Sequence, residues 1–357
     1  MPRILFTGGG TAGHVTPNIA LIEALADKGW ECRYVGSRRG IEQQLIAPLG
    51  IHYTAIFSGK LRRYFSWQNF IDPFFILLGI FQSLWLCLTN RPQIVFSKGG
   101  FVAVPVVFAA WLCRIPVISH ESDITPGLAN KLCLPFSRLL CVNFAETKNY
   151  LPASVAKDQV RVTGSPLRAG LRNTDANRGR QFLNFSEQQP ILLVVGGSLG
   201  ARVLNDVIWN NLGLLTARYQ IAHMVGAGNR RADIETSGYR QFEYLGDEYG
   251  DVLAAADLVI SRAGANSLFE LLTFRKPHLL VPLTALASRG DQLVNARIMA
   301  EAGMSLVIQE SLLTSETLMT ALASLADTAS WQAAMAGFPD SDGVSQILSL
   351  IEQTASL

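Results

Sequence analysis

Two glycine-rich loops in this sequence are candidate binding sites for phosphate groups. The first, Gly8-Gly9-Gly10-Thr11-Ala12-Gly13-His14, follows the apolar run 4–6, and the second, 196–201, follows the apolar run 191–195. Backbone N–H groups at the start of a helix can hold a phosphate, because glycine lets it approach closely and the helix dipole favours negative charge. Two such loops predict two anionic ligands. The alternative is that both are only tight strand-to-helix turns.

His14 ends the first loop and is the first candidate for proton transfer. An imidazole has an ordinary pKa near 6.5, so its neutral form can accept a proton from a substrate hydroxyl beside the bound phosphate. The alternative is a histidine that caps the helix or binds the phosphate. The two roles differ in kinetics, since loss of a base lowers kcat whereas loss of a phosphate ligand mostly raises KM.

Residues after neighbouring apolar runs are expected to complete this first site. Gly99 and Gly100 follow the run 94–96, and Glu121 and Asp123 follow the next run along the chain. Ligands of a parallel sheet bind outside the carboxyl ends of its strands, where these residues should meet. Glu121 is therefore the second candidate base, and Gly99, Gly100 and Asp123 extend the phosphate site.

The second half of the chain carries a carboxylate suited to a sugar. Glu270 lies one turn into an otherwise apolar helix that follows the segment 261–264. A carboxylate in apolar surroundings needs hydrogen-bond donors, and the diol of a ribose offers two. The alternative is an exposed glutamate on the polar face of that helix. The polar segment 288–292 opens a further helix and is placed to bond a sugar.

These sites must be positioned by alternating strands and helices. Short β-branched runs separated by longer helical stretches predict an α/β fold with two doubly wound, Rossmann-like units that share a central cleft. We expect an N-terminal domain over 1–163, a C-terminal domain over 164–340 and a last helix within 341–357 that packs back on the body. The predicted strands of both series are the apolar runs 4–6, 32–35, 94–96, 116–118, 139–142, 191–195, 221–225, 258–260 and 279–281.

Composition excludes several classes of protein. The 357 residues suit about two domains, and 49% hydrophobic against 16% charged residues excludes a disordered chain. A net charge of +2 gives no basic excess for a nucleic-acid partner. Five cysteines without metal-site spacing read as small buried side chains in a reducing compartment, and the first residues lack a secretory signal, so we expect a cytoplasmic protein. No acidic pair or histidine cluster calls for a metal or cofactor.

The segment 74–88 could be mistaken for a membrane span. At 15 residues it is shorter than the roughly 18–20 that a span requires, so we expect a helix lying on an apolar surface. Arg62 and Arg63 precede the segment, and Phe81 and Trp85 lie within it. Basic residues beside an aromatic face suit anionic lipid headgroups, which predicts peripheral binding to a membrane. Burial in the core is the alternative for the aliphatic residues.

A set of motifs in fixed order resembles the MurG family of peptidoglycan glycosyltransferases, within glycosyltransferase family 28. The motifs are GGGTAGHVTPNIA, SKGGFVAVP, HESDITPGLANK, TGSPLR, GGSLGA, RAGANSLFE and GDQLVNA. The resemblance implies the GT-B fold, with the acceptor on the N-terminal domain and UDP-GlcNAc mostly on the C-terminal one. It implies an inverting transfer, in which the C4 hydroxyl of the muramoyl sugar of lipid I attacks C1 of GlcNAc to give lipid II.

The resemblance also assigns roles to residues of this chain. Thr11, Ala12 and Gly13 match positions that reach the donor and acceptor phosphates, and His14 matches the base. Contacts with the donor are implied for Arg168, Ser198, the main chain at Gly246 for uracil, Glu270 for the ribose and Gln292 for the GlcNAc hydroxyls. Asp291 stands where the family often has a first glutamine. The implied partners are UDP-GlcNAc, the polyprenyl-pyrophosphoryl acceptor, an anionic membrane on its cytoplasmic face and other cell-wall enzymes.

Two other functions fit parts of the sequence. One is a related transferase with another lipid acceptor, because the loops that choose the acceptor cannot be read from the sequence. The other is an NADPH-binding oxidoreductase built on the first glycine loop, with Arg38 and Arg39 where an NAD enzyme would have an acidic residue. The nucleotide that raises Tm would separate the oxidoreductase from the transferases, since a ligand stabilises the native state that it binds. A panel of acceptors would separate the two transferases.

Overall fold

The computed structural model describes residues 1–59, 68–167, 169–171, 173–197, 199–285, 289–338 and 342–356. The chain forms two compact units. Unit 1 comprises Met1–Arg168 together with Ser341–Leu357, and unit 2 comprises Ala169–Asp340. Each unit is described by itself.

Unit 1 is built on a seven-stranded sheet in which all neighbouring strands are parallel, in the order β3-β2-β1-β4-β5-β6-β7. All five apolar runs predicted in this half are strands, and two further strands lie at the edges of the sheet. The strands are β1 (Arg3–Thr7), β2 (Glu31–Ser37), β3 (His52–Ile56), β4 (Ile94–Ser97), β5 (Val117–Glu121), β6 (Leu139–Val142) and β7 (Val160–Val162).

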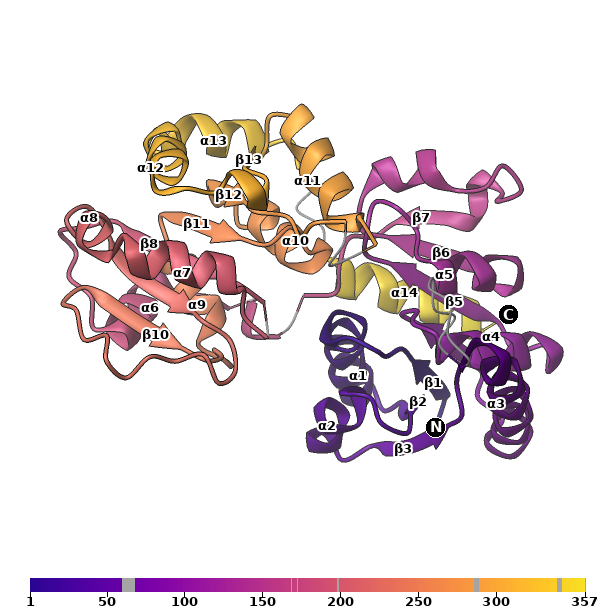
Figure 1. The fold of residues 1–357 in the computed structure, drawn as a ribbon. Coiled ribbons are helices and arrows are strands. Elements are labelled where there is room, and N and C mark those ends of the chain that lie inside the picture. Colours follow the sequence, from indigo (N-terminus) through magenta and orange to yellow (C-terminus); the bar gives the residue numbers. More distant parts are fainter. Residues whose placement is uncertain are drawn as a thin grey trace. The chain divides into compact units, whose positions relative to one another are not determined.

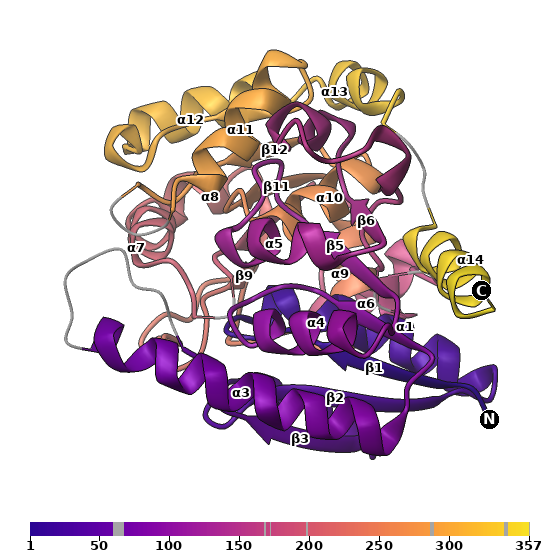
Figure 2. The same ribbon diagram turned by 90° about the vertical axis from the view of Figure 1, so that its right-hand side faces the viewer.

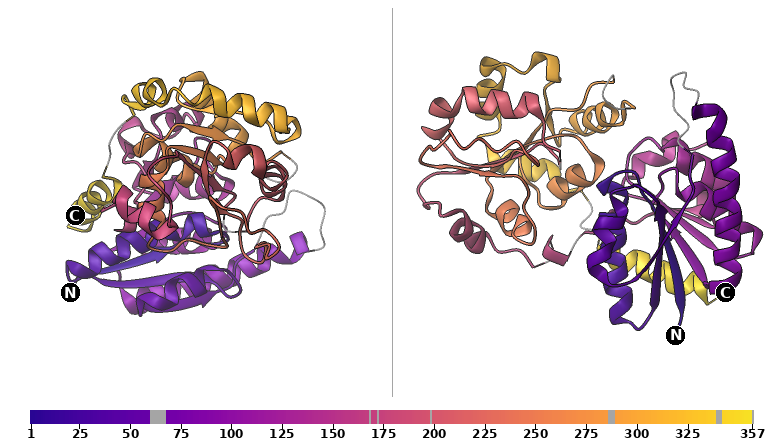
Figure 3. Two further views of the ribbon diagram at one scale, coloured as in Figure 1. Left: turned by 90° about the vertical axis from the view of Figure 1, so that its left-hand side faces the viewer. Right: turned by 60° about the horizontal axis from the view of Figure 1, so that its bottom comes forward.

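Helices cover both faces of this sheet, as the apolar side chains of both faces require. Ile4 and Phe6 belong to a core to which three helices contribute, whereas the intervening Leu5 belongs to a core on the other face. Figure 3 shows α1, in indigo, and α3, in purple, on opposite sides of the sheet. The helices are α1 (Thr16–Asp27), α2 (Glu42–Ile46), α3 (Gln68–Asn90), α4 (Ala103–Leu112), α5 (Leu128–Cys133) and α14 (Gly343–Ala355).

The last helix, α14, belongs to unit 1 although it follows all of unit 2 in the sequence. Ile347 and Ile351 of α14 pack in one core with Leu21 and Leu25 of α1. An ion pair of 2.6 Å between Lys28 and Glu352 joins the ends of the two helices. Figure 1 shows α14, in yellow, beside α1.

Helix α3 corrects one expectation from the sequence. It spans 23 residues rather than 15, because polar residues before the apolar segment continue the helix. Asp72–Asn90 is, within the described part of the chain, one helix long and apolar enough to cross a membrane by length and composition. Yet one of its faces packs on α4, beside which it runs in Figure 2. Gly79 meets the backbone of Phe57, so this face belongs to the fold.

Unit 2 repeats the same topology with other residues. Its six parallel strands have the order β10-β9-β8-β11-β12-β13, which is the order 3-2-1-4-5-6 of the doubly wound dinucleotide-binding fold. The strands are β8 (Ile191–Val195), β9 (Gln220–Met224), β10 (Tyr239–Phe242), β11 (Leu258–Ser261), β12 (His278–Leu280) and β13 (Leu306–Val307). The helices are α6 (Ala176–Leu183), α7 (Arg202–Asn210), α8 (Leu212–Thr216), α9 (Tyr249–Ala255), α10 (Ala265–Thr273), α11 (Asp291–Glu301), α12 (Ser315–Ser324) and α13 (Thr328–Met335).

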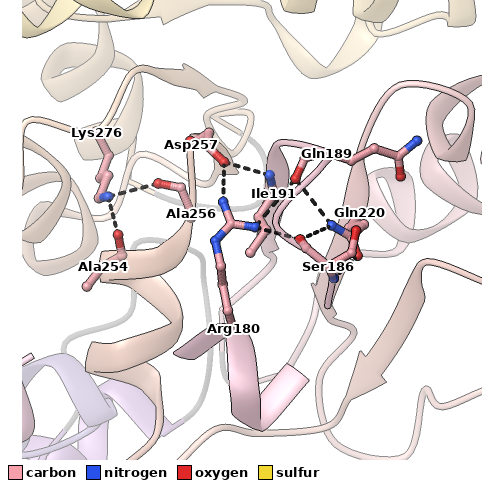
Figure 4. A network of polar contacts seen from close by, with 9 residues as sticks. All are labelled: Arg180, Ser186, Gln189, Ile191, Gln220, Ala254, Ala256, Asp257 and Lys276. Carbon is pink, nitrogen blue, oxygen red and sulfur yellow. Dashed lines mark hydrogen bonds and ion pairs between the residues drawn. The ribbon is translucent and has the colours of Figure 1, made fainter. Parts of the chain in front are cut away.

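A polar network fixes the amino ends of the central strands of unit 2 (Figure 4). Asp257, just before β11, accepts from the backbone N–H of Ile191 at 2.7 Å and from Arg180 at 3.4 Å. Lys276, just before β12, donates to the carbonyls of Ala254 and Ala256 at the end of α9, at 2.7 and 2.8 Å. A cation at a helix C-terminus is favourable, so Lys276 stabilises the packing of α9 at the amino ends of these strands.

Candidate active site

Both glycine loops lie where a doubly wound sheet binds its ligands. The strand order reverses between β1 and β4 in unit 1 and between β8 and β11 in unit 2. The loops 8–14 and 196–201 each follow the first strand of such a pair, at its carboxyl end. We call the surroundings of loop 8–14 the N-terminal half-site and those of loop 196–201 the C-terminal half-site. Each unit therefore has one candidate site at its topological switch point.

In the N-terminal half-site, the loops after β1 and β4 are packed backbone against backbone. Gly100 has φ +83°, a conformation that L side chains rarely adopt, and a Cβ there would lie 2.3 Å from the carbonyl oxygen of Gly9. Only glycine meets both conditions without a shift of the loop. Gly9 and Gly100 are thus in contact, and Gly10 and Gly99 are their neighbours in the chain.

The imidazole of His14 is held in one orientation. Its Nδ1 lies 3.0 Å from the carbonyl oxygen of Gly9. Since a carbonyl oxygen can only accept, Nδ1 carries the proton and Nε2 of the neutral ring keeps its lone pair. Burial lowers the pKa of His14, and the nearby charge of Lys98 lowers it further. The neutral form of His14, with Nε2 able to accept a proton, is therefore favoured at neutral pH.

Lys98 is a buried cation next to this histidine. Its ammonium donates to Nδ1 of His120 at 2.9 Å and to the hydroxyl of Ser122. His120 in turn donates from Nε2 to the carbonyl of Gly164 at 3.1 Å, so its ring is neutral. Burial lowers the pKa of Lys98 to about 8, and it lowers the pKa of His120 well below the usual range. The hydrogen-bond partners of this cation are therefore neutral, while the nearby charges of Glu121 and Asp123 raise its pKa.

Glu121 has a different environment from His14. One of its oxygens accepts from the backbone N–H of Asp123 at 3.0 Å. The other accepts from the backbone N–H of Gly127 at 2.8 Å and from the amide of Asn130 at 2.9 Å. These three bonds tie the loop after β5 to the start of α5. A carboxylate engaged in this way is a weaker candidate base than His14, whose Nε2 keeps its lone pair.

Sequence reasoning did not single out Glu42, whose side chain packs against the first loop and bonds to its backbone. This fully buried carboxylate accepts from the backbone N–H of Ser37 at 2.8 Å and from that of Gly10 at 3.4 Å. A Cβ on Gly9 would lie 2.6 Å from it. No motif points to Glu42, because its partners come together only when β1 and β2 pair.

The C-terminal half-site has its own set of polar side chains. Arg262, directly after β11, forms an ion pair with Glu310 and donates to the carbonyl of Val281 at 3.1 Å. Gln292, in the first turn of α11, accepts from the backbone N–H of Leu283 at 3.0 Å through Oε1, which orients its amide so that Nε2 is the donor. The fully buried Asn295 bonds the carbonyl of Ala263 at 3.2 Å.

Glu270 is buried, which excludes the alternative of an exposed glutamate on the polar face of its helix. Its side chain is only 9% exposed, in the second turn of α10. Oε2 accepts from the hydroxyl of Tyr249 at 3.1 Å. Tyr249 begins α9 and was not singled out in the sequence, where nothing indicates that it reaches α10.

The structure describes some of the other predicted site residues but not all of them. Thr11 and Gly246 are exposed, whereas Ala12, Gly13 and Asp123 are half-buried. The predictions for Arg62, Arg63, Arg168 and Ser198 lie outside the described residues. Among the residues that are described, no group of three or more His, Cys, Asp or Glu side chains could hold a metal ion.

Phe81 and Trp85 lie on an exposed apolar stripe of α3. They are 68% and 70% exposed, and Cys87 of the same helix is buried. The stripe recurs every three or four residues, at Phe74, Leu77, Phe81, Trp85 and Leu88. Burial in the core therefore holds for one face of the helix only.

Known proteins resemble this chain over nearly its whole length. The glycosyltransferase family 28 N-terminal domain matches residues 4–138, and the C-terminal domain of the same family matches residues 191–349. A protein of Lachnoclostridium phytofermentans is 49% identical over 99% of both chains, and one of Legionella pneumophila is 50% identical over 90% of this chain and 88% of its own. Both are named UDP-N-acetylglucosamine--N-acetylmuramyl-(pentapeptide) pyrophosphoryl-undecaprenol N-acetylglucosamine transferase.

Solved structures confirm the predicted GT-B fold. MurG of Acinetobacter baumannii matches with a TM-score of 0.78 at 24% identity, over 99% of this chain and 100% of its own. The glycosyltransferase of kitacinnamycin matches with a TM-score of 0.76 at 15% identity, over 99% of both chains. The identity to the named relatives, together with both domain matches, is the evidence for ancestry. The chain therefore belongs to glycosyltransferase family 28, together with these N-acetylglucosamine transferases.

Proposed function

We propose that this protein transfers GlcNAc from UDP-GlcNAc to undecaprenyl-pyrophosphoryl-MurNAc-pentapeptide, lipid I, and so makes lipid II for peptidoglycan. The observation that carries this function is the 49% identity to a transferase of that name over 99% of both chains. The chemistry of the N-terminal half-site supports it, since the orientation of His14 provides a base. The NADPH hypothesis explains the first loop alone and is not retained.

The reaction is an inverting displacement with one proton transfer. The C4 hydroxyl oxygen of the muramoyl sugar forms a bond to C1 of GlcNAc while the bond from C1 to the diphosphate oxygen breaks. The electron pair of the broken bond leaves with UDP. The hydroxyl proton passes to Nε2 of His14, which is the accepting nitrogen because Nδ1 is bonded to Gly9. Glu121 organises its loop through the bonds described above.

The C-terminal half-site binds the donor. In this proposal Glu270 accepts hydrogen bonds from the ribose diol, and Nε2 of Gln292 donates one to a GlcNAc hydroxyl. The main chain at Gly246 contacts uracil. The negative charge that develops on UDP is stabilised by backbone N–H groups of loop 196–201 and by the start of α7. Activity that is unchanged after treatment with EDTA would support a transfer that needs no bound metal.

The experiment that tests this function is transfer of labelled GlcNAc from UDP-GlcNAc to a short-chain lipid I analogue. Labelled lipid II and release of UDP that requires the acceptor are the expected results. If folded protein gives no product although UDP-GlcNAc raises its Tm, UDP-GlcNAc would remain the proposed donor, and lipid I would be refuted as the acceptor. A panel of other polyprenyl-linked sugars would then identify a relative with a different lipid acceptor.

The same proposal places the protein on the cytoplasmic face of a membrane, where a polyprenyl-linked acceptor resides. The exposed stripe of α3 supports this location, because a row of aromatic and aliphatic side chains on one helix face suits the headgroup boundary of a bilayer.

Vesicle binding tests the membrane proposal. Phe81→Ser combined with Trp85→Ser should release the protein from vesicles that contain anionic lipid, in a sedimentation assay. The matched control changes two exposed leucines of unit 2, Leu214 and Leu312, to serine. Sedimentation of the α3 variant at the level of the control would contradict the proposal.

A further inference from the structure

A single tyrosine joins two parts of the C-terminal half-site. Tyr249 is the first residue of α9, and its hydroxyl donates to Oε2 of Glu270 in α10 at 3.1 Å. Its backbone N–H donates to the carbonyl of Gly246 at 3.2 Å. One residue therefore connects the segment proposed to meet uracil with the carboxylate proposed to meet ribose.

The hydrogen bond from Tyr249 to Glu270 is important because both side chains are buried. Tyr249 is 5% exposed and Glu270 is 9% exposed. A carboxylate withdrawn from water needs hydrogen-bond donors, and hydrogen bonds to charged groups are stronger than those between neutral groups. A phenol is protonated at neutral pH and can donate one bond. The bond from Tyr249 therefore restricts how the carboxylate of Glu270 can turn.

The ligand proposed for this carboxylate is a vicinal diol. An ionised carboxylate has two oxygens with about four acceptor positions, and Tyr249 donates to Oε2. A vicinal diol can donate two hydrogen bonds to such a group. Because the ring of Tyr249 is packed, the position of its hydroxyl is set by the fold rather than by the ligand.

We propose that Tyr249 is a positioning residue for the nucleotide part of the donor: its hydroxyl fixes the carboxylate of Glu270 toward the ribose diol, while its backbone holds the Gly246 segment that meets the base. This inference rests on the proposed function, since it takes Glu270 to bind the ribose of UDP-GlcNAc. The inference adds Tyr249 to the donor site, and it expects the contribution of Tyr249 to nucleotide affinity to depend on the ribose hydroxyls.

Substitution by phenylalanine isolates the hydroxyl, because the ring and its packing remain. Tyr249→Phe should weaken UDP binding about tenfold, which corresponds to about 1.4 kcal/mol. The KM for UDP-GlcNAc should rise by a similar factor while kcat changes little, since ribose binding is the same in the ground state and the transition state. Binding of 2′-deoxy-UDP should weaken less, because that nucleotide already lacks one donor to the carboxylate.

The test is isothermal titration calorimetry of UDP and 2′-deoxy-UDP with the wild type and Tyr249→Phe. The matched control is Tyr239→Phe, which removes another buried hydroxyl of unit 2, bonded to Trp209 and His223. Tm verifies that each variant is folded. We expect the preference of the wild type for UDP over 2′-deoxy-UDP to shrink in Tyr249→Phe and to persist in Tyr239→Phe.

Three other results have distinct meanings. An equal loss of affinity for both nucleotides in Tyr249→Phe would mean a structural role and overturn the inference. An unchanged preference in the folded variant would overturn it as well. No binding of UDP to the wild type would refute the proposed function itself, and the inference with it.

Discussion

The two half-sites share one topology but differ in their chemistry. In each, a glycine loop leaves the first strand at the point where the strand order reverses. The N-terminal half-site has two histidines and a buried lysine around its loop, namely His14, His120 and Lys98. The C-terminal half-site has an oriented amide, a carboxylate that accepts from a tyrosine, and an arginine paired with a glutamate. In the proposed function, the backbone binds phosphate in both half-sites, whereas the side chains assign proton transfer to one half-site and recognition of the donor to the other.

The largest expected effect is that of His14→Ala on the N-terminal half-site. Loss of a general base lowers kcat by about 10²–10⁴-fold, whereas the KM for UDP-GlcNAc should change little, because the proposed function assigns most contacts with the donor to unit 2. Steady-state kinetics with both substrates varied measure the two parameters. The control is His52→Ala, at an exposed histidine of β3. A rise in the KM for the lipid with kcat intact would make His14 a phosphate ligand and weaken the contrast between the half-sites.

A pair of glycine substitutions compares the packing of the two loops. Gly100→Ala introduces a Cβ 2.3 Å from the carbonyl oxygen of Gly9 at a positive φ, so the backbone of the loop must move. Gly197 has a similar φ of +87°, but a Cβ there meets no atom of the described residues within 4 Å. We expect Gly197→Ala to lower the free energy of unfolding by about 1–2 kcal/mol, the cost of a left-handed residue, and Gly100→Ala to lower it by more. Urea denaturation measures both, and equal losses would contradict the difference in packing.

The interior of the fold was predictable from the sequence, and its edges were not. All nine predicted apolar runs are strands, because central strands of a parallel sheet are buried on both faces and consist of apolar residues. The four strands that escaped prediction, β3, β7, β10 and β13, are the edge strands of the two sheets, where a polar pattern is tolerated. The length of α3 was wrong for a related reason, because a helix can continue through polar residues that hydropathy does not mark.

The candidate site was predictable where it depends on local motifs. Glycine loops and His14 are adjacent in the sequence, so their spacing carried the information. Glu42 and Tyr249 act through partners that lie 32 and 21 residues away, Gly10 and Glu270, and only the packed structure shows those bonds. Burial distinguishes Glu270 from a surface glutamate in the same way, since the helical pattern alone leaves both positions open.

The smallest expected effect is a change in pH dependence on removal of the buried cation. The pKa of His14 is lowered by burial and by Lys98, and it is raised by the bond to Gly9 and by the charges of Glu121 and Asp123. Lys98→Met removes a like charge, so the pKa of His14 should rise. The base is active when neutral, and the acidic limb of the kcat profile should therefore move to higher pH, with kcat recovering above that limb.

Two further variants test the direction of this pH shift and provide a control for it. Asp123→Asn removes a charge that raises the pKa of His14, so its acidic limb should move to lower pH, opposite to that of Lys98→Met. Lys131→Met, at an exposed lysine of α5, should leave the limb in place. The measurement is kcat against pH with both substrates saturating and with Tm recorded for each variant. If Lys98→Met and Asp123→Asn move the limb in the same direction, the field around His14 does not set its pKa, and the electrostatic contrast between the half-sites fails.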